Sequence, residues 1–223
     1  MTLQINLNTL MKKEVITMMN RIPGCIEETA GGKSLIPLDT RNLAGGIIYL
    51  SGPVIEETSE NIITQILYCK ERGLPIHLLI NSVGGSVTAG LAIYDILRTI
   101  GLEINTYCIG IAASMAAVIL ASGDKGHRYI LPHSKVMIHE PLIADGLGGA
   151  ASSVQRSAEM LLQTKDMLNT ILSECTGRKK KEIDEATLYD HFFDAKEAQR
   201  FGLIDKIITD ADGYDALLAA TRI

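Results

Sequence analysis

A serine at the junction of two apolar segments could act as a nucleophile. Ser114 follows residues 104–109, an expected buried strand, and residues 110–113, which are small except for Ile111. It precedes the uncharged stretch 115–122. If a strand turns into a helix here, Ser114 lies at the helix N-terminus, where free N–H groups and the helix dipole stabilise a developing oxyanion. Taken alone, the segment favours the simpler interpretation of a serine that only caps the helix.

A nucleophilic serine needs a general base, and the base needs a group that orients it. His139 ends the apolar run 136–138, so a strand there would present its ring at the edge of the sheet; a half-buried structural histidine is the alternative. The other histidines have no comparable setting. The residue pattern leaves the orienting acid open among four residues of the tail, Asp184, Glu185, Asp190 and Asp194.

Paired glycines, Gly84 and Gly85, lie in the segment 81–86 between an expected strand and an expected helix. Glycine permits backbone angles that expose N–H groups, so this turn could hold an anion or an oxyanion. It lacks the lysine of a phosphate-binding P-loop and the spacing of a dinucleotide fingerprint. By itself the motif also fits an ordinary tight turn.

Hydrophobic periodicity and glycine stops predict alternating strands and helices, which is typical of a parallel sheet with crossover helices. Strands are expected at 47–50, 76–80 and 104–109, and helices at 59–72, 86–100 and 112–122. Two short strands, 129–131 and 136–138, precede a long helix over 152–175. The tail predicts helices at 179–189 and 195–201, a strand at 204–208 and an amphipathic turn at 214–220. Residues 1–22, with a helix expected at 8–19, form an N-terminal arm or leader, and 23–223 a single domain.

Composition excludes several classes of protein. The net charge of −5 argues against a surface that binds nucleic acid. The longest apolar run, 115–121, is far too short to span a membrane. The cysteines, Cys25, Cys69, Cys108 and Cys175, have no metal-ligand spacing and are expected to be reduced. A cytoplasmic protein is therefore expected.

Several long motifs, in order, resemble the family of Clp protease proteolytic subunits, ClpP. They are IEET at 26–29, IIYLSGP at 47–53, INSVGGSVTAGLAIYD at 80–95, AASM at 112–115, LPHSKVMIHEP at 131–141 and the segment 195–205. The resemblance implies that Ser114 is the nucleophile, His139 the general base and Asp190 the orienting acid. It also implies an oxyanion hole made by the backbone N–H groups of Gly85 and Met115.

The resemblance further implies a crotonase-like ClpP fold, which is mainly parallel with a protruding strand-helix handle over residues 146–175. Such chains form stacked heptameric rings that cleave polypeptides delivered by an AAA+ unfoldase. The ATP is used by that partner, and no cofactor or metal is expected in this chain. Whether a paralogous chain shares the ring is left open.

The resemblance places an unfoldase-docking pocket over five residues, Leu79, Tyr107, Ile109, Tyr129 and Leu131. Some positions depart from the family: Val83 replaces a usual proline, and Leu188 and Tyr189 replace an acid and an arginine that pair across the contact between rings. These departures motivate an alternative, a structural or regulatory ring subunit with weak activity. A second alternative is an acyl-CoA enzyme on the related crotonase fold.

Overall fold

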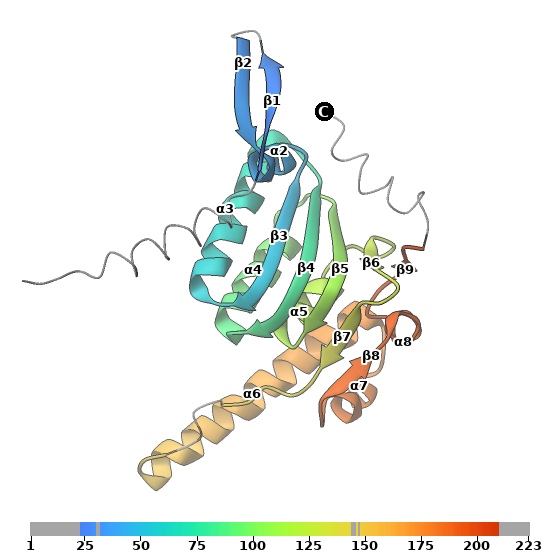
Figure 1. The fold of residues 1–223 in the computed structure, drawn as a ribbon. Coiled ribbons are helices and arrows are strands. Elements are labelled where there is room, and N and C mark those ends of the chain that lie inside the picture. The colour runs from blue at the N-terminus through green and yellow to red at the C-terminus, as the bar shows by residue number, and fades with distance from the viewer. Residues whose placement is uncertain (1–22, 30–31, 144–145, 147, 210–223) are drawn as a thin grey trace, which may run out of the picture.

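A computed structural model describes residues 23–29, 32–143, 146 and 148–209 (Figure 1). The central sheet has five parallel strands in the order β3 (Ile47–Val54), β4 (Ile76–Gly85), β5 (Ile104–Ala113), β6 (Arg128–Ile130) and β9 (Lys206–Ile207). β7 (Lys135–Ile138) pairs in parallel with the end of β5, and β8 (His191–Phe193) pairs antiparallel with β7. The predicted α/β class with a mainly parallel sheet is confirmed, whereas β8 was not predicted. The expected helix at 8–19 and turn at 214–220 lie outside the described residues.

Helices α3 (Glu56–Arg72), α4 (Val87–Thr99) and α5 (Met115–Ala121) connect successive strands and lie behind the sheet in Figure 1. Alternate strand residues face them: Ile48, Leu78 and Cys108 belong to the main core, whereas Ile47, Leu79 and Tyr107 form a separate cluster on the other face. Helix α3 ends at Gly73, whose left-handed conformation (φ 66°) closes it as the sequence predicts.

Helix α5 begins at Met115 rather than at residue 112. Residues 111–113 extend β5 instead, because Ile111, Ala112 and Ala113 pair with Lys135, Val136 and Met137 of β7. Alanine has no preference for strands, so this ladder, formed with a segment 24 residues away, overrides the local propensity. The correction places Ser114 directly at the end of a strand.

The long helix α6 (Ala151–Thr176) projects away from the sheet (Figure 1). Its buried residues, Leu168, Asn169 and Leu172, all lie in its second half, where it packs against the core. The described residues between β7 and α6, which are 139–143, 146 and 148–150, contain no strand.

An antiparallel hairpin of β1 (Gly24–Thr29) and β2 (Gly32–Pro37) extends from the opposite end of the molecule and leads into α2 (Leu38–Ala44). The sequence patterns did not predict it. Helices α7 (Lys180–Ala186) and α8 (Ala195–Phe201) complete the tail. None of the four cysteines forms a disulfide bond in the structure.

A buried ion pair ties the tail to the sheet. The Arg128 guanidinium donates to both carboxylate oxygens of Asp205, at 2.8 and 2.7 Å, and to the Cys175 carbonyl at 2.8 Å. Burial by itself would raise the pKa of the Asp205 carboxyl, but the hydrogen bonds and charge of Arg128 outweigh it, and the pKa lies below its usual value.

Replacing Asp205 by alanine should therefore lower the free energy of unfolding by about 3–5 kcal/mol, because it leaves the Arg128 charge buried without a partner. Since the folded-state pKa is lowered, the contribution of Asp205 is fully present above pH ~4 and is lost as the pH falls through the folded-state pKa. Urea unfolding across this pH range measures both effects. Glu185→Gln, which breaks the exposed pair with Lys181, is the matched control and should change stability by less than about 0.5 kcal/mol.

Candidate active site

Ser114 occupies a strained turn between β5 and α5. Its backbone angles, φ 55° and ψ −125°, make it the one described residue other than glycine with positive φ. The Ser114 N–H donates to the Met137 carbonyl at 2.9 Å, and its side chain makes no capping hydrogen bond to α5. Such a conformation costs on the order of 1–3 kcal/mol and persists where the surroundings enforce it, most often at functional sites. The interpretation of Ser114 as a simple helix cap is therefore wrong.

The strand register brings His139 and Asp190 together although they are 51 residues apart. Ile138 of β7 lies opposite His191 of β8, so the next antiparallel pair along this ladder is His139 and Asp190. The two side chains meet at 2.9 Å between His139 Nδ1 and Asp190 Oδ1. The His139 side chain is 18% exposed and that of Asp190 is 63% exposed. Water therefore reaches the carboxylate in the single chain.

His139 also contacts the serine, with 2.9 Å between its Nε2 atom and Ser114 Oγ. Because a carboxylate only accepts hydrogen bonds, the proton of the neutral ring belongs on Nδ1 and faces Asp190. Nε2 is then free to accept the Ser114 hydroxyl proton. A carboxylate, an imidazole and a hydroxyl hydrogen-bonded in series can turn the hydroxyl into a nucleophile.

The other acids that the sequence left open have different partners. Asp184 accepts from Asn169 at 2.7 Å and pairs with Lys180. Glu185 lies near Lys181, and Asp194 caps α8 by accepting from the Glu197 N–H at 2.8 Å. Of the four acids, Asp190 is therefore the one that the structure places against the histidine.

The glycine turn 84–85 lies directly against the Ser114 turn. A Cβ atom on Gly84 (φ 84°) would come within 2.5 Å of the Ala113 carbonyl oxygen and 2.9 Å of the Met115 N atom. A Cβ atom on Gly85 would lie 2.3 Å from the Val54 carbonyl oxygen. The Ser82 hydroxyl accepts from the Gly84 N–H at 3.1 Å and holds this turn. The turn that carries Gly85 thus lies next to the Met115 backbone N atom, although the two residues are 30 positions apart in the chain.

A small apolar cavity opens beside Ser114 and His139. Its volume is about 20 Å³, little more than one water molecule occupies. It is lined mainly by the aliphatic side chains of Val87, Met115, Val118, Ile138, Leu168 and Leu172. The sequence analysis did not identify this cavity, because its walls come from α4, α5, β7 and α6.

The five residues expected to form a docking pocket also come together, on the sheet face opposite the main core. Leu79, Tyr107 and Tyr129 are buried there, with Ile109 and Leu131 packed against them. Leu79, Tyr107, Ile109 and Leu131 line a cavity of about 380 Å³ together with Tyr49 and Ile208, which the sequence analysis missed; Tyr129 packs behind Tyr107 and does not line it. The rings of Tyr107 and Tyr129 stack at 4.8 Å, and the Tyr107 hydroxyl lies 3.0 Å from His77 Nδ1.

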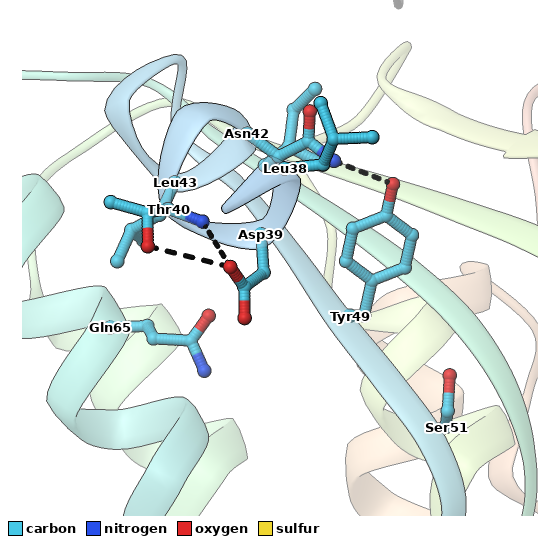
Figure 2. Close-up of a pocket in the computed structure, with 9 residues that line it drawn as sticks. Leu38, Asp39, Thr40, Asn42, Leu43, Tyr49, Ser51 and Gln65 are labelled. Carbon is cyan, nitrogen blue, oxygen red and sulfur yellow. Dashed lines mark hydrogen bonds between the residues drawn. The ribbon is translucent and has the colours of Figure 1, made fainter. Parts of the chain in front are cut away.

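A larger hollow of about 680 Å³ lies between α2, β3 and α3 (Figure 2). Tyr49 borders both this hollow and the docking pocket, and its hydroxyl lies 3.2 Å from Asn42 Nδ2. Within this hollow, the Thr40 hydroxyl and backbone N–H both donate to Asp39, at 3.4 and 2.6 Å, and no histidine is among the lining residues. The series of a carboxylate, an imidazole and a hydroxyl lies at the smaller cavity. Among the described residues, no cluster of three or more His, Cys, Asp or Glu could hold a metal ion.

Within the described part of the chain, no helix is long and apolar enough to cross a membrane. A mainly parallel α/β fold with a Ser-His-Asp series at its strand ends is an arrangement typical of serine hydrolases. The chain belongs to the Clp protease family, whose model matches residues 32–211. The resemblance seen in the sequence motifs is thereby confirmed, and the chain is a protease subunit.

Two curated relatives support this assignment. They are the ATP-dependent Clp protease proteolytic subunit 2 of Chlamydia trachomatis serovar D and the protein of the same name from serovar A. Each is 41% identical to this chain over 195 residues, which cover 86% of this chain and 95% of the relative.

Proposed function

We propose that this chain is a serine endopeptidase and the proteolytic core of an ATP-dependent degradation machine. The observation that carries the proposal is the unbroken series from Asp190 through His139 to Ser114, with 2.9 Å at each contact. The substrates that we propose are unfolded polypeptides, delivered by a partner unfoldase.

Catalysis begins when the Ser114 Oγ atom attacks a peptide carbonyl carbon and His139 Nε2 takes the hydroxyl proton. Asp190 orients the ring and stabilises its cationic form. The backbone N–H groups of Gly85 and Met115 donate to the oxyanion, and each such donor is typically worth about 3 kcal/mol of barrier. His139 then protonates the leaving amine as the C–N bond breaks, which leaves an acyl group on Ser114. A water molecule, deprotonated by His139, releases the acyl group and regenerates the hydroxyl.

A fluorophosphonate tests the proposal directly, because it reacts with an activated serine and leaves a stable phosphonyl adduct. We expect mass spectrometry of the assembled full-length protein to find the adduct on Ser114, and Ser114→Ala to abolish it. An assembled protein without the adduct would instead favour the structural ring subunit. Turnover of an acyl-CoA that survives Ser114→Ala would favour the crotonase-type enzyme.

The assembly that we propose is a homo-oligomer of stacked heptameric rings. Helix α6 supports this, since Met160 (67% exposed) and Leu162 (65% exposed) present apolar side chains on the projecting helix. Leu188 and Tyr189, next to Asp190, are also exposed. A contact over these residues would exclude water from Asp190 and strengthen its bond to His139.

An AAA+ unfoldase would dock at the apolar pocket around Tyr107 and Tyr129 and would supply the ATP chemistry. Ile109→Ser should lower unfoldase-dependent degradation of a protein substrate by roughly tenfold or more while short-peptide hydrolysis stays within about twofold of wild type. Leu67→Ser, which alters an exposed apolar residue of α3 outside this pocket, is the matched control. Equal loss of both activities in Ile109→Ser would argue against a docking role.

A further inference from the structure

The segment that carries Asp190 has few contacts of its own. Asp190 is 63% exposed, and the two residues before it are exposed as well, Leu188 at 48% and Tyr189 at 79%. The last buried residue before them is Thr187, which is fully buried. On its N-terminal side, the Asp190 segment is therefore anchored at Thr187; on its C-terminal side it is anchored by β8, which pairs with β7.

A backbone hydrogen bond joins Thr187 to the segment that follows His139. The Glu140 N–H donates to the Thr187 carbonyl at 2.7 Å. The contact between His139 and Asp190 therefore lies between two backbone connections. One is this hydrogen bond, which we call the bridge, and the other is the β7–β8 ladder. A shift of the bridge would change the distance between the imidazole and the carboxylate.

Helix α6 holds both ends of this bridge. Lys165 Nζ lies 2.5 Å from Glu140 Oε2, and Asn169 Nδ2 lies 3.1 Å from Thr187 Oγ1. Residues four apart share a helix face, so the two side chains act from one surface of α6. Asn169 is buried, and its amide also donates to Asp184 Oδ1 at 2.7 Å. That carboxylate can only accept, which fixes the orientation of the amide.

We infer that Asn169, Thr187 and Lys165 are positioning residues for the His139–Asp190 pair, an inference that rests on the proposed peptidase function. Thr187 and Lys165 do not line the cavity beside Ser114 and act by holding the bridge; Asn169 does line that cavity, and its amide also donates to Thr187. Loosening the bridge lets Asp190 move away from His139 Nδ1. The imidazole then loses its orientation, so kcat falls while the KM for a short peptide stays near its wild-type value.

Thr187→Val tests this role, because it keeps the shape of the side chain and removes the hydroxyl that Asn169 binds. In the assembled full-length protein, kcat for a fluorogenic peptide should fall roughly tenfold to hundredfold, the range expected for a misplaced catalytic group. Thr187→Ser restores the hydroxyl and should return kcat to within about threefold of wild type. Thr170→Val removes a hydroxyl on α6 that bonds only the Asp166 carbonyl, and it should leave kcat unchanged.

A positioning role also predicts that the effect disappears when Asp190 is already absent. In an Asp190→Ala background, Thr187→Val should lower the residual rate by less than about twofold. A full loss that persists in this background, or a Thr187→Val protein with wild-type kcat, would overturn the inference. If Thr187→Val fails to assemble, the half-exposed Lys165→Met decides in its place: a non-additive fall in kcat supports the role, and an unchanged kcat overturns it.

The proposed function and this inference fail in different ways. A wild-type assembly that neither hydrolyses peptides nor reacts with a fluorophosphonate at Ser114 would remove the proposed function. A reactive Ser114 together with unchanged kcat in Thr187→Val and Lys165→Met would remove the positioning role alone.

Discussion

Replacing Ser114 by alanine should lower kcat for peptide hydrolysis by roughly 10⁶-fold, and replacing His139, or both residues at once, should cost about the same. The two losses do not add, because the hydroxyl and the imidazole act as one unit across the 2.9 Å contact between Oγ and Nε2. The residual rate over water would come from the oxyanion donors and substrate binding. Asp190→Asn should cost less, about 10⁴-fold, because it removes orientation and charge but neither reacting group.

Steady-state hydrolysis of one peptide by the three variants and the double variant, all in the same assembled state, measures this cycle. Sedimentation of each variant establishes that assembly is equal. A double variant far slower than either single variant would mean that Ser114 and His139 act independently, and the triad mechanism would then be lost.

Replacing Gly84 by alanine should lower kcat by at least about a hundredfold, the cost of losing one oxyanion donor. The new Cβ atom would lie 2.5 Å from the Ala113 oxygen and 2.8 Å from Ser114 Cβ. Since such distances are closer than van der Waals contact, the glycine turn or the Ser114 turn must move. Either movement separates the Gly85 N–H from the site of the oxyanion.

Gly52→Ala separates this effect from backbone strain. Gly52 has a similar positive φ of 77°, but a Cβ atom added there would have no other atom within 4 Å. Both variants should lose stability, because alanine is strained at positive φ. Only Gly84→Ala should lose more activity than its loss of stability explains. Peptide hydrolysis measures the activity of both variants, and urea unfolding measures their stability. Comparable activity losses in the two would mean that strain alone explains the effect.

The structure agrees with the sequence analysis most closely where the signal is local. The helix expected at 195–201 has those bounds in the structure. The sequence also predicts that two helices end before Gly73 and Gly101, and both glycines have positive φ just beyond those helices. Disagreement occurs where distant segments pair. Residues 112 and 113 become strand because β7 lies beside them. The segment His191–Phe193 was missed because it shows no alternation of its own and becomes β8 by pairing with β7, more than 50 residues away.

The same division holds for the candidate site. Residue patterns singled out Ser114, His139 and the glycine turn, but they favoured a helix cap for Ser114 and left four acids open. The resemblance to the Clp proteases selected Asp190, and the structure places that residue against His139.

The sequence by itself determined most of the parallel strands and connecting helices, and which side chains could do chemistry, because hydrophobic periodicity and glycine stops mark those segments. It did not predict β1, β2 or β8. Only the tertiary structure decided which acid meets His139, that Ser114 takes a strained turn, and that α6 braces the segment before Asp190. These features depend on the register between strands and on contacts between residues tens of positions apart. No local pattern encodes such contacts.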